Sequence, residues 1–161
     1  MNNEIHLVTD FKTLKVRDRG PAIAGIWLAS GDTQFPIKGW SDFVVVVLGW
    51  WAVAIVRLMR SDSDKELVNF MDGPYSVELT RAQLGEIRLR MLAGAGGGRE
   101  VAVGEADLQK FVTELTDHAR DLLELCKLRQ WWSADAETLE SNLRDLDSEM
   151  AARRRGASIA G

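Results

Sequence analysis

Few residues in this chain combine the types and the spacing that catalysis or metal binding requires. His6 and His118 are distant in sequence, and the only cysteine, Cys126, follows His118 by eight positions. On a helix, eight residues rise by about 12 Å, which is too far for a shared zinc ion or for a hydrogen-bonded nucleophile and base. We therefore expect no catalytic residues, no metal site and no cofactor.

Two segments resemble ligand-binding loops only in part. The segment 94–98 has the glycines of a phosphate loop but lacks the Gly-Lys-Ser/Thr sequence that holds phosphates and Mg²⁺. It is more typical of a mobile hairpin connection. Asp62, Asp64 and Glu66 alternate as calcium ligands do, but the glycine and terminal glutamate of a helix-loop-helix calcium site are missing at the required offsets.

The strongest functional signal is an excess of acidic residues toward the C terminus. Residues 1–104 carry twelve acids and twelve bases, whereas residues 105–149 carry twelve acids and five bases. A negative surface can accelerate the encounter with a basic partner, although any soluble helix pair also needs a charged exterior. The residues that we expect in a binding surface are Asp117, Asp121, Glu124, Asp145 and Glu149.

Six tryptophans include two adjacent pairs, and adjacency has a geometric consequence. Neighbouring residues on a helix point about 100° apart, so Trp50 and Trp51 cannot both face one narrow core seam. The same holds for Trp131 and Trp132. Core filling accounts for most tryptophans, but an exposed member of a pair is a candidate for partner binding, because tryptophan is enriched in interaction hot spots. We assign Trp50 and Trp131 to the expected binding surface.

The most strongly patterned segment of the chain is the uncharged run of residues 43–56, which must help to position these side chains. Its fourteen residues are too few for a membrane span, which needs about 20. Consecutive valines are also typical of a strand, so residues 43–48 remain open to both helix and strand. The apolar pattern continues to Met59, which is too long for an ordinary strand and favours a helix. Ser41 or Asp42 is the expected N-cap.

Apolar periodicity divides the rest of the chain into strands and two late helices. One helix is predicted from the apolar face between Leu108 and Cys126, and a second is predicted to begin at Ser133 or Asp135 and reach Met150. The first two strands can pair with each other or with a central hairpin. The predicted strands are 5–8, 22–29, 67–71, 75–79 and 86–92, with Asp72-Gly73-Pro74 as the hairpin turn.

Together these elements predict an α+β fold, in which an antiparallel sheet of about five strands is packed by a central apolar helix and two C-terminal helices. Length and composition fit one domain over residues 1–155, followed by a disordered tail over 156–161. The single cysteine excludes an internal disulfide, and the N terminus lacks the basic and apolar order of a secretory signal. We therefore expect a cytoplasmic protein, and the sequence leaves its oligomeric state open.

Four short motifs lie within residues 23–80: Phe35-Pro36-Ile37, Trp40-Ser41-Asp42, Trp50-Trp51 and Asp72-Gly73-Pro74-Tyr75. Together they resemble immunity proteins of bacterial polymorphic toxin and contact-dependent inhibition systems. The resemblance implies a small, non-catalytic cytoplasmic α+β protein that binds and blocks one cognate toxin domain. It transfers no binding residues to this chain, so the expected binding surface rests on charge and aromatic placement alone.

The sequence thus predicts a non-catalytic protein-binding module of the immunity type, whose acidic and aromatic surface occupies a basic site on a toxin domain. A second hypothesis is a small-ligand enzyme with a pocket between sheet and central helix, using Asp72, Tyr75 or His118. A third is a homo-oligomeric structural module that buries the tryptophans between copies. The neutral first 104 residues and the short apolar run indicate neither a nucleic-acid nor a membrane partner.

Overall fold

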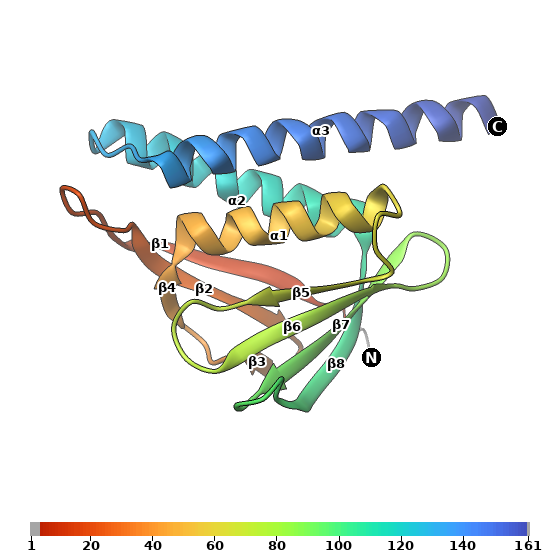
Figure 1. The fold of residues 1–161 in the computed structure, drawn as a ribbon, viewed down its shortest axis with the longest axis horizontal. Coiled ribbons are helices and arrows are strands. Elements are labelled where there is room, and N and C mark those ends of the chain that lie inside the picture. The colour runs from red at the N-terminus through yellow and green to blue at the C-terminus, as the bar shows by residue number, and fades with distance from the viewer. Residues whose placement is uncertain (1–3, 161) are drawn as a thin grey trace.

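The computed structural model describes residues 4–160 and has the predicted α+β fold. Over these residues, eight strands form two antiparallel sheets of four strands each, and three helices lie together on one side of them (Figure 1). The chain therefore has more strands than the five expected, in two sheets rather than one. The three additional strands are Thr33–Phe35, Ser41–Phe43 and Arg99–Asp107. The first two are only three residues long, and the apolar residues of the third are small or exposed, so none of the three has a strong apolar alternation in its sequence.

The first sheet is organised around β2. β1 pairs with β2 in antiparallel register, with His6 opposite Ala29, and β2 also pairs with β3 and β4. The first two strands thus pair with each other and not with the central hairpin. The strands of this sheet are β1 (His6–Lys15), β2 (Ile23–Ser30), β3 (Thr33–Phe35) and β4 (Ser41–Phe43).

The second sheet is a meander in the order β5-β6-β7-β8, and it contains the predicted hairpin. Alternating residues of β6 and β7, such as Val77, Leu79 and Leu89, point into the core and are fully buried. β5 pairs only with β6 among the described strands, so it forms an edge of the sheet. The strands are β5 (Lys65–Asn69), β6 (Tyr75–Arg81), β7 (Glu86–Ala93) and β8 (Arg99–Asp107).

The uncharged run forms the central helix, α1 (Val44–Met59), so the valines are helical. α1 packs against β5 and α3, and together with α2 it lies between the sheets and α3 (Figure 1). Its buried side chains include Leu48, Trp51 and Ile55, all without exposed surface. The expected side-chain N-cap is wrong, because Phe43 occupies the N-cap position and makes no capping side-chain bond.

Aromatic rings join the two sheets. Phe35 and Trp40 from the first sheet and its following loop each contact both Phe70 and Tyr75 of the second, with edge-to-face geometry and ring centroids 5.1 to 6.5 Å apart. Gly73 is required beside them, because its φ is +79° and a Cβ there would lie 2.9 Å from the Tyr75 ring. Three of the four motifs that carry the immunity resemblance therefore meet at this junction.

Asp42 lies at the same junction, where its side chain links backbone amides to the aromatic ring of Trp40. The carboxylate is buried and accepts hydrogen bonds from the Trp40 indole at 3.0 Å, from the Phe43 amide at 2.7 Å and from the Asp72 amide at 3.3 Å. Asp72 belongs to the turn between β5 and β6, so this one carboxylate connects the first sheet to the second. It is therefore a structural acceptor in place of the predicted helix cap.

Two long helices cover the outer side of α1 and the first sheet. α2 (Leu108–Leu128) has the predicted apolar face and is capped by Asp107, whose side chain accepts from the Lys110 amide at 2.9 Å. α3 (Ala134–Ala160) is longer than predicted. The expected disordered tail is helical up to residue 160, and residue 161 lies outside the described residues. No helix within residues 4–160 is long and apolar enough to span a bilayer.

Candidate functional site

A row of exposed apolar side chains runs along α1 and onto the elements beside it. In the part of the chain that the structure describes, ten large apolar side chains are exposed, and five of them line two hollows next to α1. Val46 lines the first hollow and Trp50 the second, and these residues are one helical turn apart on α1. We call the five exposed residues together with the half-buried Val46 the α1 strip, which consists of Trp132, Met71, Val46, Trp50, Val53 and Leu67.

The α1 strip is exposed because it follows one face of a helix that is otherwise packed. Val46, Trp50 and Val53 recur at helical spacing, and Arg57 continues the same face. On one flank of α1, Arg57 forms an ion pair with Glu66 of β5. On the other flank, Arg60 at the C-cap contacts α3. The α1 part of the strip, Val46, Trp50 and Val53, therefore lies between β5 and α3, and an ion pair fixes each of these two elements to α1.

The second hollow lies between α1 and β5 and has a volume of about 280 Å³. Trp50, with 39% of its surface exposed, and Val53 form the helix side of it, and Leu67 and Asn69 form the strand side. The one charged residue that lines it, Glu66, is neutralised by Arg57. This hollow is therefore an uncharged groove beside the edge of a sheet.

The first hollow, of about 600 Å³, lies at the start of α1 and contains the second tryptophan pair. Trp131 is only 8% exposed, and its indole donates to the Gly20 carbonyl at 3.1 Å. Trp132 is 38% exposed and stacks under Lys127, whose Nζ lies 4.9 Å from the ring centroid. The exposed member of this pair is thus Trp132, and Trp131, which was predicted to lie in the binding surface, is buried.

The five predicted acidic residues do not form one surface. Asp117, Asp121 and Glu124 are exposed on α2, with Arg120 of the same helix paired to Asp147 of α3 between the two helices. The other two are on α3 at the end of α1. There, Glu149 accepts from Arg60 Nε at 2.6 Å; this hydrogen bond and the weaker attraction of Asp145 raise the pKa of Arg60. Glu149 and Asp145 therefore flank α1, and the α2 acids form a separate group.

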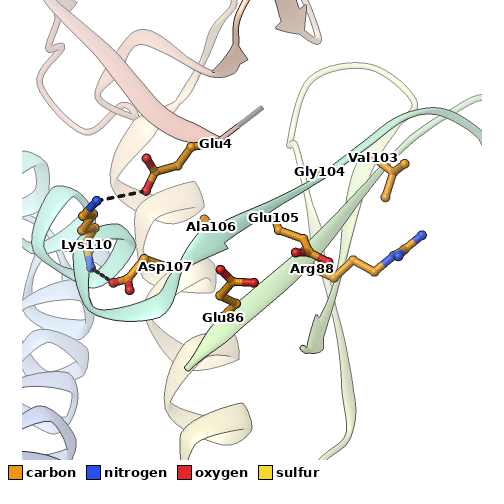
Figure 2. Close-up of a pocket in the computed structure, with 9 residues that line it drawn as sticks. All are labelled: Glu4, Glu86, Arg88, Val103, Gly104, Glu105, Ala106, Asp107 and Lys110. Atoms are coloured by element: carbon orange, nitrogen blue, oxygen red, sulfur yellow. Dashed lines mark hydrogen bonds and ion pairs between the residues drawn. The ribbon is translucent and has the colours of Figure 1, made fainter. Parts of the chain in front are cut away.

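A third hollow, of about 570 Å³, lies where the start of the chain meets β7, β8 and α2. Figure 2 shows its acidic lining, with the Glu86 and Glu105 carboxyl groups directed toward one another, the Lys110 side chain directed toward Glu4 and the Lys110 backbone amide directed toward Asp107. The Nζ of Lys110 is 3.7 Å from Glu4. The backbone here also joins the sheets, because the Ile5 amide donates to the Glu105 carbonyl at 3.0 Å.

The acidic hollow has unusual protonation but no metal geometry. A side-chain hydrogen bond with Glu105 is the main cause that raises the pKa of Glu86, and burial and the charges of Glu105, Asp107 and Glu4 add to it. Two carboxyl groups that share a proton reduce their mutual repulsion. Within residues 4–160, no group of three or more acidic, histidine or cysteine side chains has an arrangement that would hold a metal ion.

The residues of the enzyme hypothesis do not converge. His118 Nε2 donates to the Leu7 carbonyl of β1, and His118 Nδ1 forms a hydrogen bond with Thr9 Oγ1, both at 2.8 Å. Tyr75 packs instead in the aromatic junction between the sheets, and Asp72 is exposed in the hairpin turn. The hollow between α1 and β5 is lined by none of these three residues, and apolar core side chains fill the space between α1 and the sheets elsewhere. The three side chains thus belong to separate sites.

Five residues of the α1 strip were not predicted for the binding surface: Val46, Val53, Leu67, Met71 and Trp132. They lie on α1, β5, the following turn and the α2–α3 connection, so only the fold assembles them. One sequence signal points to the two valines on α1, Val46 and Val53, because a helix that is apolar on all faces must bury every face or present one to a partner. Comparisons of the chain with protein-family models, with curated proteins and with solved structures found no match.

Proposed function

We propose that the chain is a non-catalytic protein-binding module of the immunity type, which blocks a toxin domain by binding it through the α1 strip. The observation that carries the proposal is the set of five exposed apolar side chains that line two hollows beside α1, with the indole of Trp132 in one hollow and the indole of Trp50 in the other. Contiguous exposed apolar patches mark interaction sites, and tryptophan is among the residues most enriched in binding hot spots.

The helix presents this surface in a rigid form. Trp50 extends from α1 beside Trp51 and Ile55, which are fully buried. Lys127 further restricts Trp132. A surface that is already ordered loses little conformational entropy on binding, so more of the contact energy contributes to affinity.

The surroundings of the strip supply the polar rim that protein interfaces have. Arg57 and Glu66 border it on the β5 side, and Arg60, Asp145 and Glu149 border it at the end of α1. The α2 acids Asp117, Asp121 and Glu124 lie apart from this rim. Their role in the proposal is to attract a basic partner from a distance, which increases the rate of association.

Site-specific photo-cross-linking tests the proposed surface. A photoreactive amino acid replaces Trp50 in one variant and Leu128 in a matched control, because Leu128 is 74% exposed but lies outside the strip. Both variants are expressed in the source cells and irradiated. Position 50 should capture one protein in equimolar complex, and position 128 should not capture it. Equal capture at both positions would show that the strip is not the interface.

Growth protection tests the immunity form of the proposal. The captured protein is expressed in a test strain with the wild-type chain, with Trp50→Ser or with Leu128→Ser. Growth arrest that is relieved by the wild type and by Leu128→Ser, but not by Trp50→Ser, would support neutralisation through the strip. A captured protein that does not arrest growth would contradict the immunity role and leave a binding module of another kind. Self-capture in a concentration-dependent dimer would instead support the homo-oligomer hypothesis.

A further inference from the structure

β5 presents an open backbone edge beside the α1 strip. The Phe70 amide donates to the Tyr75 carbonyl at 3.0 Å, so Phe70 and Tyr75 form a hydrogen-bonded pair. In an antiparallel ladder such pairs alternate with pairs whose amides and carbonyls point away from the neighbour. From the register of β5 and β6, Val68 and Glu66 therefore face β6, whereas Leu67 and Asn69 direct their backbone groups to the open edge.

The first outward position of β5 already has a partner. Ser63 Oγ donates to the Lys65 carbonyl and accepts from the Lys65 amide at 3.2 Å, which agrees with the alternation. No side chain or loop within residues 4–160 makes an equivalent bond to the backbone of Leu67 or Asn69. The open edge is thus limited to the two positions that line the second hollow with Trp50 and Val53.

The open edge specifies the form of an occupant. Outward amides and carbonyls at alternate residues match the spacing of another extended backbone, which can pair with all of them at once. A strand beside β5 would have side chains pointing alternately toward α1 and away from it, so every second side chain would meet Trp50, Val53 and Ala54. Because Arg57 neutralises Glu66, the groove has no net charge, and it complements a segment that is uncharged at those positions.

A second copy of the chain fits the groove less well than a short peptide segment. The two outward residues of β5 offer about four backbone hydrogen bonds, which is a short contact. Permanent homodimers typically bury about 2,000 Å² or more of surface, so they need a more extensive one. A two-fold pairing of β5 strands about Leu67 would also place Lys65 opposite Asn69 and Glu66 opposite Val68, without any complementary charge to fix the register.

We infer that the partner binds the α1 strip with an extended, uncharged segment that adds to the open edge of β5 as a strand and inserts alternate apolar side chains toward Trp50 and Val53. This inference rests on the proposed function and specifies the shape of the bound segment. Strand addition beside a helix combines backbone hydrogen bonds, which supply affinity, with a side-chain groove, which supplies selectivity.

Selection from a library of random dodecapeptides tests the inference on the full chain, with the Trp50→Ser variant used to remove peptides that bind elsewhere. The tightest peptide is then synthesised with a single N-methyl group at each backbone position in turn. Strand addition predicts that N-methylation weakens binding by about tenfold or more at every second position and has little effect between them. Apolar residues of the selected peptides should also alternate.

A matched pair of variants tests the same bonds from the side of the protein. Leu67→Pro removes an outward amide that β6 does not use, so an edge strand tolerates it, whereas Leu67→Ala keeps the amide and shortens the side chain. After a thermal melt has shown that both are folded, Leu67→Pro should weaken peptide binding by about tenfold and Leu67→Ala by about threefold at most. If Leu67→Pro does not fold, Asn69→Pro and Asn69→Ala provide the same contrast.

The outcomes separate the inference from the proposed function. Two results would overturn strand addition and leave the α1 strip as a binding surface. In the first, the Trp50-dependent peptides have apolar residues three or four positions apart, as a helix does. In the second, N-methylation weakens their binding at no position or at consecutive positions. A dimer that Leu67→Pro dissociates, without any Trp50-dependent peptide, would replace the peptide segment with a second copy. The absence of both would overturn the proposed surface as well.

Discussion

At the scale of single residues, Trp50 and Trp51 have opposite environments although they are adjacent and identical. Trp51 has no exposed surface and its ring lies 5.4 Å from that of Phe111, whereas Trp50 is 39% exposed beside β5. The indole nitrogen of Trp51 is buried without a hydrogen-bond partner among the described residues. Trp51 therefore contributes through its volume, and Trp50 is available for binding.

Alanine substitutions should separate these roles. Trp51→Ala leaves a large cavity in the core and should lower the free energy of unfolding by about 3–5 kcal/mol. Trp50→Ala removes a partly exposed ring and should cost about 1 kcal/mol or less. Urea denaturation monitored by circular dichroism measures both. Equal losses for the two variants would mean that Trp50 is also part of the core.

Glu86 gives a pH dependence whose sign follows from its raised pKa. The folded chain holds the Glu86 proton more tightly than the unfolded chain does, so this group stabilises the fold below the unfolded pKa of glutamate, about 4.3. That stabilisation is lost as pH rises through the raised folded pKa of Glu86, where Glu86 loses its proton and its charge is repelled by the neighbouring acidic groups. Glu86 therefore opposes folding near neutral pH.

Glu86→Gln should remove this repulsion while keeping a group that can hydrogen-bond to Glu105. We expect a higher Tm than wild type at about pH 7 and a smaller difference at about pH 4, where the wild-type side chain is protonated. Calorimetry across this range measures the effect. Glu124→Gln removes the same charge from an exposed position of α2 and is the control. A Tm gain that is independent of pH would contradict the shared-proton explanation.

At the scale of elements, α2 depends on a cap that also contributes charge to the acidic hollow. Asp107 accepts the Lys110 amide at 2.9 Å and its charge is one of the causes of the raised pKa of Glu86. Asp107→Ala should lose about 1 kcal/mol of stability through the missing cap. Asp107→Asn keeps a capping oxygen and removes the charge, so it should equal or exceed wild type near neutral pH. Chemical denaturation measures the free energy of unfolding of both variants. Equal losses of stability in Asp107→Ala and Asp107→Asn would show that the charge of Asp107 stabilises the chain.

Long elements were predictable from the sequence because their pattern is repeated over several turns. The length of the apolar run identified α1, and helical spacing identified α2. β3 and β4 were missed because three residues carry no period. The extension of α3 was missed because Gly156 suggested an end, although alanine and arginine around it favour a helix by more than one exposed glycine costs, about 1 kcal/mol.

The binding surface was less predictable because it depends on how elements meet. Helical geometry required Trp50 and Trp51 to face different directions, but the positions of α3 and β5 decide which one is exposed. Leu67 and Met71 have no sequence signal of their own. The acidic residues were assigned by charge alone, and the direction of each helix face divides them between two surfaces.

At the scale of the whole molecule, the two sheets share one core and are joined at two places. One is the backbone bond from Ile5 to Glu105, and the other is the junction around Asp42. Core residues of both sheets and all three helices form a single cluster. We therefore expect the chain to unfold as one cooperative unit.

Asp42→Ala tests this coupling, because it leaves the Trp40 indole and two backbone amides without their acceptor. It should lower the free energy of unfolding by about 3 kcal/mol, and Asp42→Asn, which keeps one acceptor oxygen, should lose less. Circular dichroism and tryptophan fluorescence should report the same midpoint in the wild type and in both variants. Separate midpoints in the wild type would show that the sheets unfold independently.

The division of α1 into buried faces and one exposed face also has an evolutionary consequence. Substitutions at Val46, Trp50 or Val53 change the surface offered to a partner and alter few core contacts, so the chain can acquire a new partner at little cost in folding. Substitutions one position away, at Val47, Trp51 or Ala52, are removed by selection for stability. Diverging copies of this chain should therefore vary most along a single helical face, at spacings of three and four residues.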